Sequence, residues 1–137
     1  MGHKKYLSTN VLEESRKRIA STFDEVDRAY IAFSGGKDSS VMFHLVMEEA
    51  VKRGVRVGVM YIDMEAQYAD TIKHTLEMFE IYKDNIDPHW ICVPMRLRNA
   101  LTNYEPQWIA WDPSREDDWI RKKPSFAKGV SDYPFIM

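Results

Sequence analysis

Seven consecutive residues combine the groups that proteins use to hold a phosphate: Ser34-Gly35-Gly36-Lys37-Asp38-Ser39-Ser40. The two glycines let the backbone turn tightly and approach a ligand closely. The serine hydroxyls donate hydrogen bonds, and Lys37 adds a positive charge. An apolar run precedes this glycine–serine loop (residues 34–40) and a mostly apolar helical stretch follows it. We therefore expect a strand, a loop and a helix N-terminus that together bind phosphate, sulfate or pyrophosphate.

The spacing separates this loop from other phosphate-binding motifs. A Walker A motif has four residues between its first glycine and its Gly-Lys pair, and the dinucleotide fingerprint reads Gly-x-Gly-x-x-Gly; neither fits. A Gly-Gly pair alone would indicate an ordinary helix cap after a glycine turn. The full string at a strand-to-helix junction favours an anion site.

A carboxylate, Asp63, is the second candidate site residue. It follows a predicted strand over 55–62 that is apolar on both faces, as in a parallel strand covered on two sides. Ligands bind outside the carboxyl ends of parallel strands, so Asp63 is expected near the glycine–serine loop. The alternative interpretation is a helix cap or a loop acid.

Two further side chains are interpreted as structural. His44 lies on the predicted helix after the loop, where a packing or capping role is favoured over catalysis. Cys92 is the chain's single cysteine and stands among Ile and Val, which is typical of a small buried side chain. One cysteine excludes an internal disulfide framework and an all-cysteine metal site.

Hydrophobic periodicity predicts the elements that position these residues. Helices are expected over 10–25, 39–53 and 67–85, strands over 28–33, 55–62 and 89–93, and a short helix over 95–101. Alternating strands and helices predict an α/β fold: an open parallel sheet with helices on both faces and right-handed crossovers. Three strands are few for such a sheet, so the architecture is expected to be truncated.

The stretch after residue 101 has no clear period. Trp108, Trp111 and Trp119 are scattered there among prolines and basic residues. They could stack nucleic-acid bases, but packing against the domain, a partner or missing structure is favoured. We divide the chain into an α/β domain that carries the phosphate-binding loop, 1–100, and an aromatic, proline-rich extension, 101–137. Residues 104–137 are the expected surface for a protein partner or a homo-oligomer.

Composition narrows the function classes. The chain has 137 residues and a formal net charge of −2, so no overall positive field attracts nucleic acid. It has no apolar run long enough to span a membrane and no secretory signal region. A cytoplasmic location is expected.

The motifs resemble those of a known family. The string Ser34–Ser39 is similar to the PP-loop, Ser-Gly-Gly-x-Asp-Ser, of the adenine nucleotide alpha hydrolase-like superfamily. The strand ending in Asp63 and the helix opening at Ala69-Asp70-Thr71-Ile72 extend the resemblance to the phosphoadenosine phosphosulfate (PAPS) reductase family, over roughly residues 25–95. Residues 63–68 and the tryptophan-rich part resemble the branch known as immunoglobulin-binding regulator A, often found near prophages, of which this chain would match only the N-terminal part.

The resemblance implies a ligand and a set of contacts. An adenine nucleotide, ATP or PAPS, with Mg²⁺ accompanying it, would bind through its phosphates or sulfate. The ATP pyrophosphatases that share the loop split ATP at the α-phosphate, and the loop holds the leaving pyrophosphate. The implied contacts are Ser34, Gly35, Gly36, Lys37, Asp38, Ser39, Ser40 and Asp63.

The chain also departs from the family. PAPS reductases have a C-terminal cysteine in a Glu-Cys-Gly-type motif, whose thiolate attacks sulfur, and this sequence has no such motif. Iron–sulfur members need several cysteines, so no cluster is expected. PAPS reduction by this chain alone is therefore not expected.

Three functions remain as hypotheses. The first is a PAPS-reductase-like domain that binds an adenine nucleotide in a transferase or oxidoreductase, for sulfur or adenylyl transfer. The second is a non-catalytic regulatory or phage-related protein that acts with a partner. The third is a module of a nucleic-acid-modifying complex.

Overall fold

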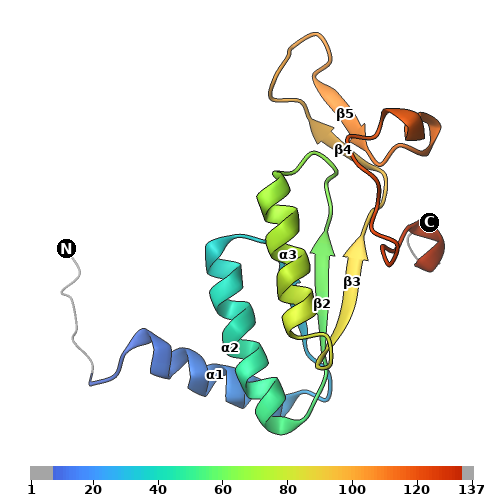
Figure 1. The fold of residues 1–137 in the computed structure, drawn as a ribbon. Helices are drawn as coiled ribbons and strands as arrows, with labels where there is room; N and C mark the ends of the chain where they lie inside the picture. Colours follow the sequence, from blue (N-terminus) through green and yellow to red (C-terminus); the bar gives the residue numbers. More distant parts are fainter. Residues whose placement is uncertain (1–7, 134–137) are drawn as a thin grey trace, which may run out of the picture.

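The computed structural model describes residues 8–133, so the last four residues of the predicted 101–137 extension lie outside it. Figure 1 shows a parallel sheet with helices packed beside it and a smaller hairpin above. The sequence prediction of an α/β parallel sheet of three strands flanked by helices is confirmed. The elements are α1 (Val11–Glu25), β1 (Tyr30–Phe33), α2 (Lys37–Arg53), β2 (Val57–Ile62), α3 (Ala69–Ile81), β3 (Ile86–Ile91), β4 (Met95–Arg98), β5 (Gln107–Ala110) and the 3₁₀ helices Pro113–Asp118 and Val130–Asp132.

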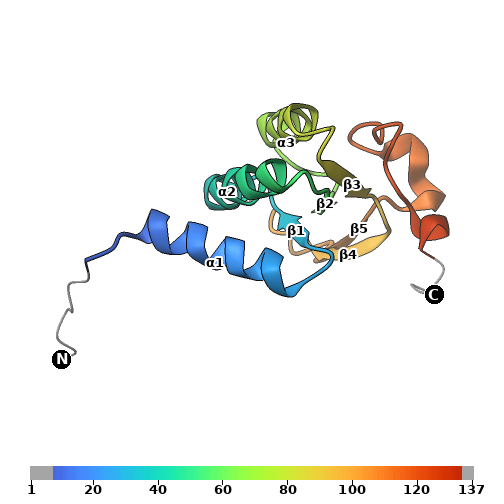
Figure 2. The ribbon, with the colours of Figure 1, turned by 90° about the horizontal axis from the view of Figure 1, so that it is seen from below.

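The three strands lie in the order β1-β2-β3, all parallel. Phe33 pairs with Tyr61, and Tyr61 pairs with Trp90, so the three carboxyl ends meet at one edge. Helices α2 and α3 lie together on one face of this sheet, and α1 packs against α2 (Figure 2). The core lies between the sheet and the α2–α3 layer, where alternate strand residues have almost no exposed surface.

The local sequence explains where α1 and α2 begin and end. The Asn10 side chain accepts a hydrogen bond of 2.9 Å from the Glu13 N–H and caps α1. Helix α2 begins after Gly36 and ends at Gly54, which adopts a left-handed φ of 66°. Both boundaries lie within two residues of the sequence prediction.

The predicted short helix over 95–101 is wrong. Residues Met95–Arg98 form β4, which pairs antiparallel with β5, so that Leu97 lies opposite Trp108. Half-buried and exposed residues alternate along β4, which is the period of a strand. This pairing crosses residue 100, where the sequence analysis places a domain boundary; the division into 1–100 and 101–137 stays a prediction.

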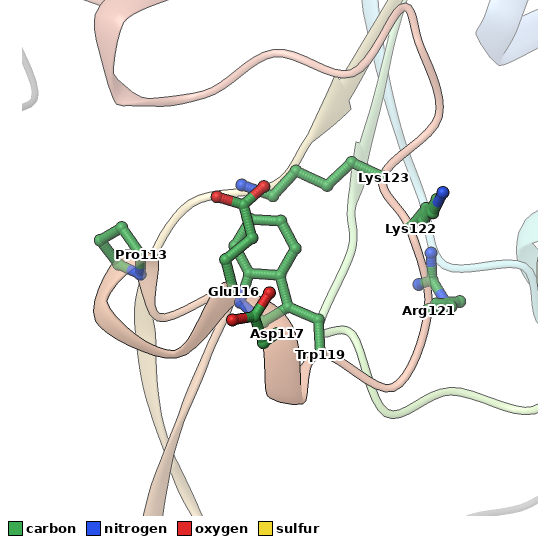
Figure 3. Close-up of a pocket in the computed structure, with 7 residues that line it drawn as sticks. All are labelled: Pro113, Glu116, Asp117, Trp119, Arg121, Lys122 and Lys123. Carbon is green, nitrogen blue, oxygen red and sulfur yellow. The ribbon is translucent and has the colours of Figure 1, made fainter.

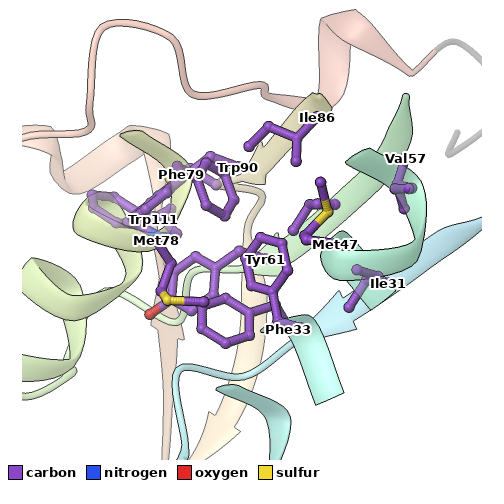
Figure 4. Close-up of a cluster of buried hydrophobic side chains, with 14 of the residues drawn as sticks. Ile31, Phe33, Met47, Val57, Tyr61, Met78, Phe79, Ile86, Trp90 and Trp111 are labelled. Carbon is purple, nitrogen blue, oxygen red and sulfur yellow. The ribbon is translucent and has the colours of Figure 1, made fainter. Parts of the chain in front are cut away.

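The chain after β5 returns to the sheet. The Lys128 N–H donates to the Trp90 carbonyl at 2.7 Å, and the Cys92 N–H donates to the Lys128 carbonyl at 2.9 Å. Trp111 has no exposed surface and is part of the core shown in Figure 4. Trp108 and Trp119 pack against that core. The described tryptophans of this stretch are therefore packed on the domain, as the favoured interpretation expects.

Candidate anion-binding site

The glycine–serine loop connects β1 to α2 at the carboxyl edge of the sheet. Gly35 adopts a φ of +74°, a conformation that side chains other than glycine rarely adopt. A Cβ at Gly35 would lie 2.7 Å from Thr71 Cγ2 and 3.0 Å from Thr75 Oγ1. Helix α3 therefore packs directly on the loop, and only glycine fits at this position.

The loop hydroxyls form a connected network. Ser39 Oγ and Ser40 Oγ each donate to the Gly36 carbonyl at 2.9 Å. Ser34 Oγ lies 2.9 Å from Ser39 Oγ. Because the single Ser39 hydroxyl hydrogen goes to Gly36, Ser34 is the donor in that pair. The side chains thus fix the loop conformation before any ligand arrives.

Helix α3 adds a histidine to this network. His74 Nε2 lies 2.7 Å from Ser40 Oγ, in a partly buried position. Sequence reasoning did not single out His74, Thr71 or Thr75 as site residues. The available signal was the spacing of four residues between Thr71 and Thr75, which puts both threonines on one face of a helix.

Backbone donors and one cation of the loop remain accessible. Lys37, Asp38 and Ser39 occupy the first turn of α2, where N–H groups have no partner within the helix. The side chains of Lys37 and Asp38 are 91% and 93% exposed and pair at 3.8 Å. An exposed pair of this kind contributes little stability, so the Lys37 ammonium can exchange its partner for an anion at low cost.

Asp63 lies at the end of β2, as predicted, but its side chain has no exposed surface. One carboxylate oxygen accepts from Trp90 Nε1 at 2.7 Å and the other from the Glu65 N–H at 2.9 Å. The Arg121 guanidinium forms an ion pair with it across 58 residues of sequence. In this arrangement Asp63 binds other parts of the protein. Its direct contact with a nucleotide stays a prediction.

Glu65 is a second buried carboxylate, 4% exposed, and its backbone has a φ of 65°. Its two oxygens accept from the Trp111 N–H at 2.6 Å and the Ile120 N–H at 3.0 Å. Trp111 Nε1 also donates to the Asp63 carbonyl at 2.6 Å. Sequence reasoning missed Glu65, although two acids flanking Met64 directly after a buried strand were a visible signal. Together, Asp63 and Glu65 (the acid pair) bind the C-terminal segment (residues 111–133) to the carboxyl edge of the sheet.

The acid pair influences its titratable neighbours. Burial and then the Asp63 carboxylate raise the pKa of the Cys92 thiol from 9.0 to about 12. The Cys92 Sγ–H donates to Asp63 at 3.6 Å. Burial, followed by the charge of Asp63, also raises the pKa of Tyr61. Cys92 is thus a buried thiol at neutral pH, which favours the structural interpretation of this residue.

The C-terminal segment borders an open pocket of about 850 Å³, shown in Figure 3. The Lys123 ammonium lies 4.2 Å from the centre of the Trp119 ring and 5.3 Å from that of Trp111. Glu116 and Asp117 bring negative charge to the same pocket. Arg121 and Lys122 line the same pocket, so its lining carries charges of both signs.

Residues 8–133 contain neither a cluster of metal-ligating side chains nor a helix that could span a membrane. No group of three or more His, Cys, Asp or Glu side chains in this part of the chain is arranged to hold a metal ion. None of the helices described in it is long and apolar enough to cross a membrane.

Comparison with known proteins identifies the family. The family model described as phosphoadenosine phosphosulfate reductase domain matches residues 28–112, from just before β1 to just beyond β5. The chain is 39% identical over 122 residues to "Uncharacterized protein YbdN" of Escherichia coli (strain K12). That match covers 88% of this chain but only 30% of the relative's length. Family membership supports a nucleotide-related function in general, and the chain belongs to the phosphoadenosine phosphosulfate reductase family.

Proposed function

We propose that this domain binds an adenine nucleotide, ATP or PAPS, through its phosphates or sulfate at the glycine–serine loop, as part of a sulfur- or adenylyl-transfer protein. The observation that carries the proposal is the preformed loop itself. Hydroxyl bonds to the Gly36 carbonyl hold it open at the N-terminus of α2, and Gly35 packs it against α3. Such a site pairs oriented N–H groups and a helix dipole with negative charge.

The chemistry of the loop is positioning and charge stabilisation. In the proposed complex, the N–H groups of the first turn of α2 donate to phosphate oxygens. Lys37 turns from Asp38 towards the ligand, since both side chains are exposed. Donors held in place before the reaction stabilise charge that develops on a leaving pyrophosphate. Mg²⁺ would accompany the nucleotide.

We propose an indirect role for Asp63. Its oxygens are occupied by the Trp90, Glu65 and Arg121 donors, so it fixes the end of β2 and the start of the segment leading to α3. Because Thr71 and Thr75 of α3 press on Gly35, this placement supports the loop. A direct contact with the nucleotide would require the C-terminal segment to move away.

We assign no thiolate chemistry to Cys92. The raised pKa of Cys92, about 12, keeps the thiol protonated, and the residue is only 1% exposed. A reactive cysteine needs a lowered pKa and access to its substrate. The proposal therefore concerns binding and positioning of the nucleotide.

Calorimetric titration with ATP, PAPS and AMP tests the proposal. We expect ATP and PAPS to bind, and AMP to bind at least about tenfold more weakly because it offers the loop fewer anionic groups. The double variant Lys37→Ala, Asp38→Ala should abolish binding. A folded sample that produced no heat with any of the three would refute the proposal.

A matched control separates the loop from surface charge in general. Lys83 and Glu80 form another exposed pair, at 2.6 Å, at the far end of α3. Replacing both by alanine removes the same two charges and should leave nucleotide affinity unchanged. Equal losses in the two double variants would show that the glycine–serine loop is not the binding site.

The nucleic-acid hypothesis gains no support from the C-terminal stretch. Trp111 is completely buried, so its ring cannot stack on a base. The 3₁₀ helix Pro113–Asp118 carries three carboxylates against one guanidinium, so these six residues form no basic patch. The regulatory hypothesis and a partner for residues 104–137 stay predictions.

A further inference from the structure

His74 of α3 contacts the hydroxyl network of the loop. Its Nε2 lies 2.7 Å from Ser40 Oγ, in a partly buried position. Ser40 Oγ also lies 2.9 Å from the Gly36 carbonyl, which accepts from Ser39 Oγ and from the Ser40 N–H as well. Both nitrogens of a charged imidazolium carry a hydrogen, so the charged form of His74 donates to Ser40 and leaves the Ser40 hydroxyl hydrogen for Gly36.

We propose that His74 is a positioning residue of the glycine–serine loop and that its protonation is coupled to anion binding there. The inference rests on the proposed function of the loop. As an imidazolium, His74 donates to Ser40, directs the Ser40 hydroxyl at Gly36 and so fixes the first turn of α2. It also places a positive charge next to Ser40 of the loop.

Other charged groups lie on the elements around His74, and most of them pair with one another. On α3, Lys73 and Glu77 pair with each other at 3.9 Å, and Asp70 lies one turn before His74. On α2, Lys37 and Asp38 pair at 3.8 Å, and His44 contacts the Tyr82 hydroxyl at 2.6 Å. On the sheet, the groups facing α3 include the Phe33 ring, 6.2 Å from the imidazole, and Tyr61, whose raised pKa keeps it neutral.

The sign of the coupling follows from the charges. A bound phosphate favours the charged form of a nearby imidazole, so anion binding takes up a proton. By linkage, anion affinity is highest at acidic pH, where an imidazole is charged. It falls as pH rises and becomes constant at alkaline pH, where the imidazole is neutral with or without the anion.

The test measures inorganic pyrophosphate binding by calorimetry between about pH 5.5 and about pH 8.5, where an unperturbed histidine titrates. Three proteins are compared: the unaltered chain, His74→Gln, which keeps an N–H donor but cannot be charged, and His74→Ala, which has neither. Dividing the affinities of the unaltered chain by those of His74→Gln at each pH cancels the titration of pyrophosphate itself. His44→Gln is the matched control, since it removes another histidine from the α2–α3 contact.

We expect the ratio of the unaltered chain to His74→Gln to be near one at high pH and to rise to about fivefold at low pH. His74→Ala should lose about fivefold at every pH from the missing hydrogen bond, in addition to the pH-dependent loss. His44→Gln should follow the unaltered chain. Circular dichroism at each pH confirms that the variants compared are folded.

The outcomes separate the two proposals. Pyrophosphate binding that is equally strong in all the proteins, at every pH, would overturn the role of His74 and leave the binding site intact. A loss in His74→Ala together with a flat ratio for His74→Gln would overturn the coupling to protonation. Failure of the unaltered chain to bind at any pH would overturn both.

Discussion

The glycine–serine loop and the acid pair both follow sheet strands at the same edge, yet they use their polar groups in opposite ways. The loop fixes itself with neighbouring hydroxyls and leaves Lys37 and the first N–H groups of α2 accessible. The acid pair is buried, and each of its four carboxylate oxygens accepts a bond from a distant part of the chain: Trp90, Arg121, Trp111 or Ile120. Accessible donors can bind a ligand, whereas buried carboxylates whose hydrogen bonds are already made hold parts of the protein together.

The largest effect is expected when Arg121, the cation that pairs with Asp63, is replaced. Arg121→Met leaves the Asp63 carboxylate buried without its ion-pair partner, which should cost about 3 kcal/mol of unfolding free energy. Urea unfolding measures the loss. Arg115 is the matched control: its pair with Asp118 is 67% and 65% exposed, so Arg115→Met should cost no more than about 0.5 kcal/mol. Equal losses of unfolding free energy in the two variants would mean that the buried ion pair of Asp63 stabilises the fold no more than an exposed pair does.

A smaller effect on stability, but a larger one on binding, is expected at the loop. Gly35→Ala adds a Cβ 2.7 Å from Thr71 in a left-handed backbone, so we expect a loss of about 2 kcal/mol and of nucleotide binding. Gly54 has a similar φ, +66°, with open space around it. Gly54→Ala should therefore cost only about 1 kcal/mol and leave binding intact. Thermal unfolding with calorimetry distinguishes the two positions.

The smallest effect concerns alkaline pH. The folded pKa of Cys92, about 12, lies above the ordinary 9.0, so the folded state keeps a proton that the unfolded state loses. Its contribution to stability is complete below about pH 9 and falls as pH rises towards the folded value. Urea unfolding between about pH 8 and about pH 10 should show this decline in the unaltered protein and a shallower one in Cys92→Ala. Parallel curves would contradict the pKa shift.

Sequence reasoning succeeded where the signal was local. The glycine–serine loop is contiguous, and the flanking apolar runs define its strand and helix, so β1, α2 and the position of the loop follow from spacing alone. Asp63 was placed correctly at the end of β2 for the same reason. Helix α3 was expected over 67–85 and ends earlier, at Ile81, because β3 begins at Ile86 and includes Pro88.

What remained unpredictable depends on long-range partners. Arg121 reaches Asp63 across 58 residues, and no periodicity marks such a pair. The four residues of β4 are too few for alternation to outweigh a helical pattern, and β5 stabilises them only once the hairpin forms. The role of His74 likewise depends on α3 lying against the loop, which the sequence does not show.

The backbone bonds of Lys128 with Trp90 and Cys92 have a consequence for assembly. They occupy the outer hydrogen-bonding groups of β3 at its carboxyl end, where an unprotected sheet would invite another chain to add a strand. Strand β1 forms the opposite edge of the described sheet. In the described part of the chain, Lys128 thus protects the carboxyl end of β3, and a strand added there would first have to displace it.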